Sequence, residues 1–434
     1  MIGEFVMHEA STFVLLLAQL AVMAACGLAG GAVMRLLRQP AVLGEMLGGV
    51  VLGPTVFGAL APEQQAGLFP LAGDAAVLRN AAVKLGMLFF MFTVGLEINA
   101  RGILKNGIGA VAIGLFGTLL PLAAGVGSVY MLPRLFGADV AADKFPLALF
   151  IGAAMANSAN PVLARILLDL GLLKDRLGAT IMAATVVDDL VSWTLLFVVF
   201  EQLKSGGESR IVSSGVAAEL LVLAGFFALT LVCGWLASRC LAKWHARRPQ
   251  HVAGRIGFLS VFVLLSAAAA EYLQIHAFLG PFLFGVALTP TEFDAQDETY
   301  EAVRRFAHGF FVPIYFVSLG LTTDFAANFA PLLTAVVLIA ACVSKIPAAY
   351  AGARLGGLGS SMSWAVGWGM NARGAIGIIL ANLGLEKGVI DQPTYVALVV
   401  MAIVTSLLAA PLMKHYMAAA ASERKSTAAL PARA

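Results

Sequence analysis

About thirteen stretches of roughly 20 mostly apolar residues run through the chain, and they constrain its fold more than any other feature. Only a helix or a closed barrel satisfies its backbone hydrogen bonds inside a bilayer, and a helix needs about 20 apolar residues to span it. Only 12% of the 434 residues are charged, about half the share found in water-soluble domains. The chain is therefore predicted to be an all-α polytopic membrane protein. The predicted spans are 12–36, 40–58, 80–98, 106–133, 146–171, 176–203, 214–240, 253–273, 276–290, 302–323, 329–355, 361–386 and 392–416.

The distribution of Lys and Arg between the short loops predicts how the chain is oriented. Loops rich in these residues face the cytoplasm. The segment before the first span has none, whereas the loop at 239–255 carries Arg239, Lys243, Arg247, Arg248 and Arg255. We therefore expect a protein of the cell membrane whose N-terminus lies outside and whose C-terminus lies in the cytoplasm. Residues 418–434 are predicted to be a short disordered cytoplasmic tail, and no nucleotide-binding regulatory domain is expected.

Weak internal similarity predicts a repeated architecture. The segment FMFTVGLEIN (90–99) resembles IYFVSLGLTTD (314–324), and GGVVLGPTVFG (48–58) loosely resembles FLGPFLFGVALTP (278–290). These pairs fall in corresponding spans if residues 12–204 and 253–416 are two six-helix units and 214–240 is a linker helix. Because a single helix lies between the two six-helix units, they cross the membrane in opposite orientations. Such inverted repeats are typical of secondary transporters. Residues 1–417 are accordingly predicted to form one transmembrane domain.

Two adjacent carboxylates, Asp188 and Asp189, lie near the middle of the predicted span 176–203. Charge at this depth is costly, so it indicates a functional site rather than an accident of composition. Neighbouring carboxylates in a medium of low dielectric constant repel each other and do not both stay ionised without a partner. Such a pair suits a group that changes protonation as a cation arrives or leaves. The alternative is a structural pair bonded to neighbouring helices.

Lys345 is a second deep charge, in the span 329–355. Its helix is the repeat mate of the span 106–133, and we expect it in the same bundle as Asp188. Lys345 is therefore predicted to pair with Asp188, which leaves Asp189 to bind the ion and the proton. The alternative is a lysine that extends its ammonium to the membrane surface.

Two spans contain sequences that interrupt a helix at mid-membrane. The first break carries Asn157, Ser158, Asn160 and Pro161, and the second carries Asn371, Arg373 and Gly374. Proline removes a backbone donor and biases the residue before it away from the helix. The breaks occupy matching positions of the two repeats, as in the substrate sites of secondary transporters. Each break creates helix ends with partial charges, which a carboxylate, a lysine or an arginine can offset.

Other functions remain open on these residues alone. An intramembrane aspartyl protease needs aspartates from different helices, whereas adjacent side chains on one helix diverge by about 100°. A channel needs no proton coupling. A proton- or sodium-coupled transporter of an organic anion would also use broken helices. We expect no enzymatic activity, no cofactor and no nucleic-acid partner.

The motifs together resemble the cation:proton antiporter-2 family, the Kef and NapA-like exchangers of monovalent cations and protons. They are QPAVLGEMLGGVVLGPTVFG (39–58), FFMFTVGLEIN (89–99), TVVDDLVSW (185–193), FVPIYFVSLGLTTD (311–324) and GMNARGAIGIILA (369–381). The resemblance covers about residues 12–416. It implies a sodium/proton antiporter-like fold of thirteen helices with two crossed, discontinuous helices. It also implies a homodimer and an elevator-like movement of a core domain that carries the ion.

The resemblance also assigns roles. Asp189 matches the family's ion- and proton-binding aspartate, Asp188 matches its partner, and Lys345 matches the lysine that pairs with Asp188. Members with two aspartates tend to be electrogenic. Two departures are evident, because Asn160 replaces an aspartate before Pro161, and Ala375 replaces a glutamate after Arg373-Gly374. Both remove a carboxylate near the predicted site. The partners implied are a monovalent cation (Na⁺ or K⁺, and also Li⁺), the proton and the lipid bilayer.

Overall fold

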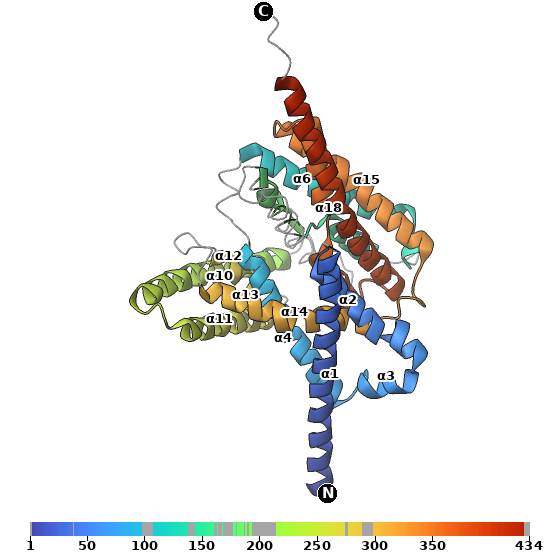
Figure 1. Cartoon of the computed structure of the whole chain (residues 1–434), viewed down its shortest axis with the longest axis vertical. Coiled ribbons are helices and arrows are strands. Elements are labelled where there is room, and N and C mark those ends of the chain that lie inside the picture. The colour runs from blue at the N-terminus through green and yellow to red at the C-terminus, as the bar shows by residue number, and fades with distance from the viewer. Residues whose placement is uncertain are drawn as a thin grey trace, which may run out of the picture. The chain divides into compact units, whose positions relative to one another are not determined.

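The computed structural model describes most of the chain, and its described residues form helices and turns, with no strand among them (Figure 1). This confirms the predicted all-α class. Asn160, Pro161 and Asp189 lie outside the described residues. Described are residues 2–37, 39–97, 107–137, 144–159, 163, 167, 177–178, 180–185, 187–188, 191–192, 214–273, 277–288 and 298–428.

Within that part of the chain, eight helices are long and apolar enough to cross a membrane. Each overlaps one of the predicted spans. They are Thr12–Leu36, Ala41–Gly58, Asp74–Leu96, Gly109–Met131, Ala224–Arg247, Val252–Tyr272, Pro331–Leu355 and Gln392–Ala420. The predicted spans 146–171 and 176–203 extend into residues outside the described set.

The chain divides into two compact units, which are described separately. Unit 1 consists of Met1–Ile98 and Ser213–Ala327, and unit 2 of Asn99–Val212 and Asn328–Ala434. Unit 1 contains α1 (Ile2–Leu36), α2 (Ala41–Leu52), η1 (Pro54–Gly58), α3 (Pro62–Leu68), α4 (Asp74–Glu97), α10 (Ser214–Arg247), α11 (Val252–Tyr272), α12 (Leu279–Ala287), α13 (Glu298–Phe306), η4 (Ala307–Phe311) and α14 (Val312–Leu321). Unit 2 contains α6 (Gly107–Met131), η2 (Pro133–Phe136), α7 (Phe145–Ala156), α15 (Pro331–Leu355), α16 (Ser360–Met370), α17 (Gly374–Glu386) and α18 (Gln392–Ala428).

In unit 1, helices cross at glycines so closely that their backbones touch. A Cβ atom at Gly49 of α2 would lie 2.0 Å from the carbonyl oxygen of Val317 in α14. One at Gly285 of α12 would lie 2.5 Å from the carbonyl oxygen of Phe92 in α4. Small residues of this kind allow close packing between membrane helices. The two crossings are related to each other, because α2 and α12 carry one pair of similar segments and α4 and α14 carry the other.

In unit 2, α6 and α15, whose spans are predicted to be repeat mates, pack against each other. A Cβ atom at Gly352 would lie 2.6 Å from the Cα atom of Ile113, so these helices also touch through their backbones. The buried core around this contact includes Leu163, Val366 and Met413. Helices α7 and α16 pack against members of the same bundle. This arrangement holds the two predicted breaks within one unit.

The second half of the chain confirms one sequence prediction and corrects another. The span 361–386 is interrupted as predicted, because it consists of two helices, α16 and α17, separated by residues 371–373. Helix α18 continues to Ala428, so residues 418–428 of the predicted disordered tail are helical. Residues 418–421 are all alanine, which has the highest intrinsic helix propensity, and this composition explains why the helix continues past the apolar span.

Candidate functional site

The first break follows directly from the end of α7. The helix ends at Ala156, and Asn157 adopts an extended conformation with φ −65° and ψ 139°. Residues 157–159 are not helical, whereas Leu163 is helical again. Asn157 and Ser158 are fully buried. A helix that ends in the core leaves carbonyl groups that need other partners, and the site is built around these groups.

The second break separates α16 from α17. Helix α16 ends at Met370, and α17 begins at Gly374, whose φ of 43° lies in the left-handed region that favours glycine. The backbone N–H of Gly374 stands at the start of a helix, where the helix itself offers no acceptor. It donates to Ser406 Oγ over 2.8 Å. Asn371 and Arg373 are fully buried. The sequence of this break therefore both interrupts the helix and restarts it.

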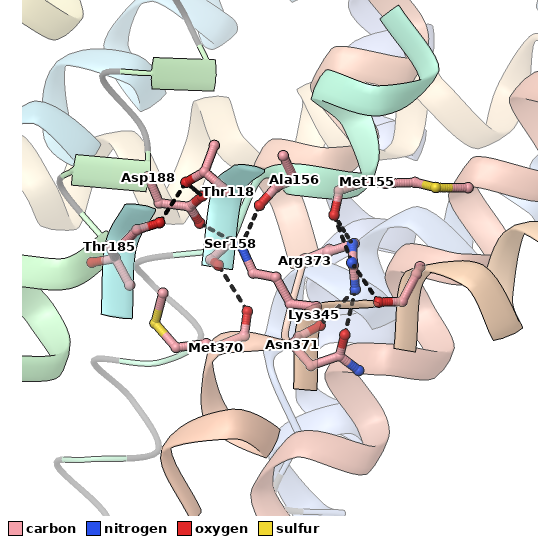
Figure 2. Close-up of polar contacts among 12 residues, drawn as sticks. Thr118, Met155, Ala156, Ser158, Thr185, Asp188, Lys345, Met370, Asn371 and Arg373 are labelled. Atoms are coloured by element: carbon pink, nitrogen blue, oxygen red, sulfur yellow. Dashed lines mark hydrogen bonds and ion pairs between the residues drawn. The ribbon is translucent and has the colours of Figure 1, made fainter. Parts of the chain in front are cut away.

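The two breaks are hydrogen-bonded to each other. The backbone N–H of Ala159 donates to the Ala372 carbonyl oxygen over 2.7 Å. The hydroxyl of Ser158 donates to the Met370 carbonyl oxygen over 2.7 Å, as Figure 2 shows. Each bond joins one interrupted segment to the other. The predicted meeting of the two broken helices is thus present in the structure of the described residues.

Asp188 and Lys345 form a buried ion pair beside the breaks. Lys345 Nζ lies 2.8 Å from Asp188 Oδ2, and both side chains are fully buried. The same ammonium donates to the carbonyl oxygen of Ala156, the last residue of α7 (Figure 2). Lys345 therefore offsets both a carboxylate and the negative end of a half-helix. Its buried ammonium is not the surface-seeking group considered as the alternative.

The other oxygen of Asp188 has a partner that the sequence reasoning missed. Thr118 Oγ1 in α6 lies 2.6 Å from Asp188 Oδ1. The available signal was Thr118 itself, a lone polar side chain amid the apolar residues 107–127. A threonine in a membrane helix commonly bonds back to its own backbone, so this signal is weak without the structure.

Arg373 is held by carbonyl groups rather than by a carboxylate among the described residues. Its guanidinium donates to Met155 O over 2.6 and 3.2 Å, and to Asn371 O over 3.0 Å. It also donates to the Asn371 side-chain oxygen over 2.7 Å and to Ala341 O over 3.3 Å. Met155 and Asn371 lie at the C-terminal ends of α7 and α16, where the helix dipoles are negative. The guanidinium therefore lies where two helix ends present partial negative charge.

The structure thus brings most of the predicted site residues together. Among the described residues, the site contains two buried cations and one carboxylate, and no group of three His, Cys, Asp or Glu side chains suited to a metal ion. The residues brought together are Asn157, Ser158, Asp188, Lys345, Asn371, Arg373 and Gly374. Asn160, Pro161 and Asp189 belong to the same segments but lie outside the described residues.

Comparison with known proteins agrees with this fold. The Na(+)/H(+) antiporter NhaS4 of Synechocystis sp. is 30% identical over 408 residues, which are 93% of this chain and 98% of that protein. Cation/H(+) antiporter 20 of Arabidopsis thaliana is 32% identical over 429 residues, 95% of this chain. The chain spans only half the length of that plant relative, 50%.

A solved structure gives the same result for the fold. The sodium proton antiporter MjNhaP1 of Methanocaldococcus jannaschii superposes with a TM-score of 0.63 at 17% sequence identity, covering 94% of this chain and 97% of that one. The family model "Sodium/hydrogen exchanger, transmembrane" matches residues 5–418. The chain is a multi-pass membrane protein, and it belongs to the family of transmembrane sodium/hydrogen exchangers.

Proposed function

We propose that this protein is a secondary active antiporter that exchanges a monovalent cation, Na⁺ or K⁺ and also Li⁺, for protons. The observation that carries the proposal is the buried Asp188–Lys345 pair at the meeting point of two helix breaks. A charge pair of this kind is costly in a membrane and marks an ion pathway by default. Both relatives named above are antiporters by name, and one is a Na(+)/H(+) antiporter.

In this proposal, the cation and the proton compete for Asp189. Asp188 has both carboxylate oxygens engaged by Lys345 and Thr118, which leaves the adjacent carboxylate to bind the cargo. A protonated Asp189 excludes the cation, and a bound cation displaces the proton. If only the loaded states cross the membrane, uphill export of the cation is coupled to proton entry.

We further propose that the site crosses the membrane in an elevator-like movement of one part of the protein. All described residues of the site belong to unit 2, which packs as a compact body of its own. A rigid carrier of this kind keeps the ion and its ligands together while access alternates. The protein would act in the cell membrane as a homodimer, with its N-terminus outside and its C-terminus in the cytoplasm.

Proteoliposomes with a trapped pH-sensitive dye test this function. Purified protein is given pulses of Na⁺, Li⁺ or K⁺ across a range of about pH 6.5 to 8.5, which brackets neutral pH. Exchange predicts dequenching that depends on the cation and is absent from liposomes without protein. The most effective ion is then the substrate. Silence with all three ions, in protein shown to be folded, would contradict exchange and favour an organic anion as substrate.

A further inference from the structure

The contact between α6 and the helix that carries Asp188 is set by a glycine one turn away. A Cβ atom at Gly114 would lie 2.8 Å from the Ala184 carbonyl oxygen and 2.7 Å from Val187 Cβ. The two helices can therefore meet this closely only where α6 has no side chain. Gly114 and Thr118 lie four residues apart on one face of α6, and Ala184 and Asp188 are four apart on the facing helix. The close approach at Gly114 brings the next turn of each helix into register.

At that next turn, Thr118 meets Asp188. The 2.6 Å separation between Thr118 Oγ1 and Asp188 Oδ1 lies in the range of a hydrogen bond from a hydroxyl to an ionised oxygen. Thr118 Oγ1 also lies 2.7 Å from the carbonyl oxygen of Gly114. A hydroxyl has one proton, so an ionised Asp188 and Gly114 compete for it. The bond to the carboxylate is the stronger because it is charge-assisted.

Thr118 and Lys345 hold Asp188 from opposite repeats. Thr118, in α6, donates to Asp188 Oδ1, and Lys345, in α15, donates to Asp188 Oδ2. All three side chains are fully buried. Helices α6 and α15 are packed against each other, which fixes the two partners relative to each other. Each carboxylate oxygen of Asp188 therefore already accepts a hydrogen bond, which makes it a weaker ligand for a cation than an oxygen without a donor.

We propose that Thr118 is a positioning residue that keeps Asp188 from coordinating the transported cation. By occupying Oδ1, it confines Asp188 to the role of a fixed negative charge beside Lys345. Loss of the hydroxyl would leave a buried carboxylate oxygen without a donor. Such an oxygen gains a partner when a cation arrives, so the cation binds more tightly and leaves more slowly. This inference rests on the proposed cation exchange.

The main test compares Thr118→Val, which removes the hydroxyl at constant shape, with Thr118→Ser, which keeps it. Thr405→Val is the matched control, because Thr405 is also fully buried and bonds back to Met401 O over 2.8 Å, with no carboxylate among its partners in the described part of the chain. In the proteoliposome assay, Thr118→Val should lower both the KM for the cation and kcat several-fold. Thr118→Ser should keep KM and kcat near the parent values, and Thr405→Val should change neither KM nor the ratio of kcat to KM. An unchanged KM in Thr118→Val, or a Ser variant that behaves like the Val variant, would overturn the assignment.

A second measurement does not depend on transport. The melting temperature of purified protein is compared for Thr118→Val in the parent and in an Asp188→Asn background. If the hydroxyl serves the carboxylate, the loss caused by Thr118→Val should be roughly halved once Asp188 is neutral, since charge-assisted bonds are about twice as strong as neutral ones. An equal loss in both backgrounds would overturn the Thr118–Asp188 contact. Absence of exchange in the parent protein together with a halved loss would instead contradict the proposed function and leave this contact intact.

Discussion

Lys345 Nζ lies 2.8 Å from Asp188 Oδ2, and neither side chain is accessible to solvent. A buried ion pair gains little stability over an apolar pair of the same shape, but removal of one partner leaves an uncompensated charge. A contribution to stability therefore does not explain why this pair is present. Its position, beside the ends of two interrupted helices, accounts for it better, because the ammonium also binds the last carbonyl of α7.

Replacement of Lys345 by glutamine should destabilise the protein. Asp188 would lose its cation, and the cost of breaking a buried pair is about 3–5 kcal/mol. A large drop in the melting temperature in detergent would show this. Lys387→Gln is the control, because Lys387 is exposed at the end of α17. The double variant with Asp188→Asn should recover part of the loss. A Lys345→Gln protein as stable as the parent would mean that the buried pair is not maintained.

The sequence sufficed for the class of fold and for the elements of the site that involve charge. Apolar length identified the spans, and the cost of intramembrane charge identified Asp188, Lys345 and Arg373. Proline, glycine and asparagine identified both interruptions. These signals are readable because each one violates the rules for an ordinary membrane helix.

Contacts between distant helices could not be predicted in the same way. Thr118 is an ordinary residue for a membrane helix, and only the close approach at Gly114 places it against Asp188. Most partners of Arg373 are backbone carbonyls, those of Met155, Asn371 and Ala341, which have no sequence signature. The extension of α18 to Ala428 follows from the helix propensity of its alanines. Apolar spans are predicted from hydrophobicity and length, which do not include helix propensity.

Arg373→Lys should reduce exchange although it keeps the charge. The guanidinium joins the ends of α7 and α16 through bonds to Met155 O and Asn371 O. An ammonium has no planar fork and does not reproduce this geometry. We expect a lower rate of cation-driven proton flux in proteoliposomes. Arg354→Lys is the control, since Arg354 is exposed and bonds to the nearby Leu358 O. Equal rates for Arg373→Lys and the parent would show that charge alone suffices.

Ser406→Ala should weaken the start of α17. Ser406 Oγ accepts the N–H of Gly374 over 2.8 Å and donates to Ala402 O over 2.7 Å. A buried donor left without a partner costs about 1–3 kcal/mol. A lowered melting temperature is expected, whereas Ser128→Ala, which removes a bond back to Ala124 O, should have a smaller effect. Equal losses in the two variants would argue against a capping role for Ser406.

Gly49→Ala should disrupt unit 1. The added Cβ would lie 2.0 Å from the Val317 carbonyl oxygen, and backbone on both sides prevents easy relaxation. Overpacking of a core costs about 1–3 kcal/mol or more. Gly127→Ala is the matched change, because a Cβ there meets no atom of the described residues within 4 Å. The Gly127→Ala protein should have the melting temperature of the parent or a slightly higher one. A Gly49→Ala protein with the same melting temperature as the Gly127→Ala protein would contradict the described crossing of α2 and α14.

The most direct test of the account is accumulation of the cation driven by an imposed proton gradient in proteoliposomes, measured with labelled Na⁺ or K⁺. The parent protein should concentrate the ion until the proton gradient is dissipated. Asp189→Asn should abolish accumulation while the protein stays folded, and Glu386→Gln, at an exposed carboxylate of the same unit, should not. Normal accumulation by folded Asp189→Asn protein would contradict the claim that the cation and the proton compete at this carboxylate.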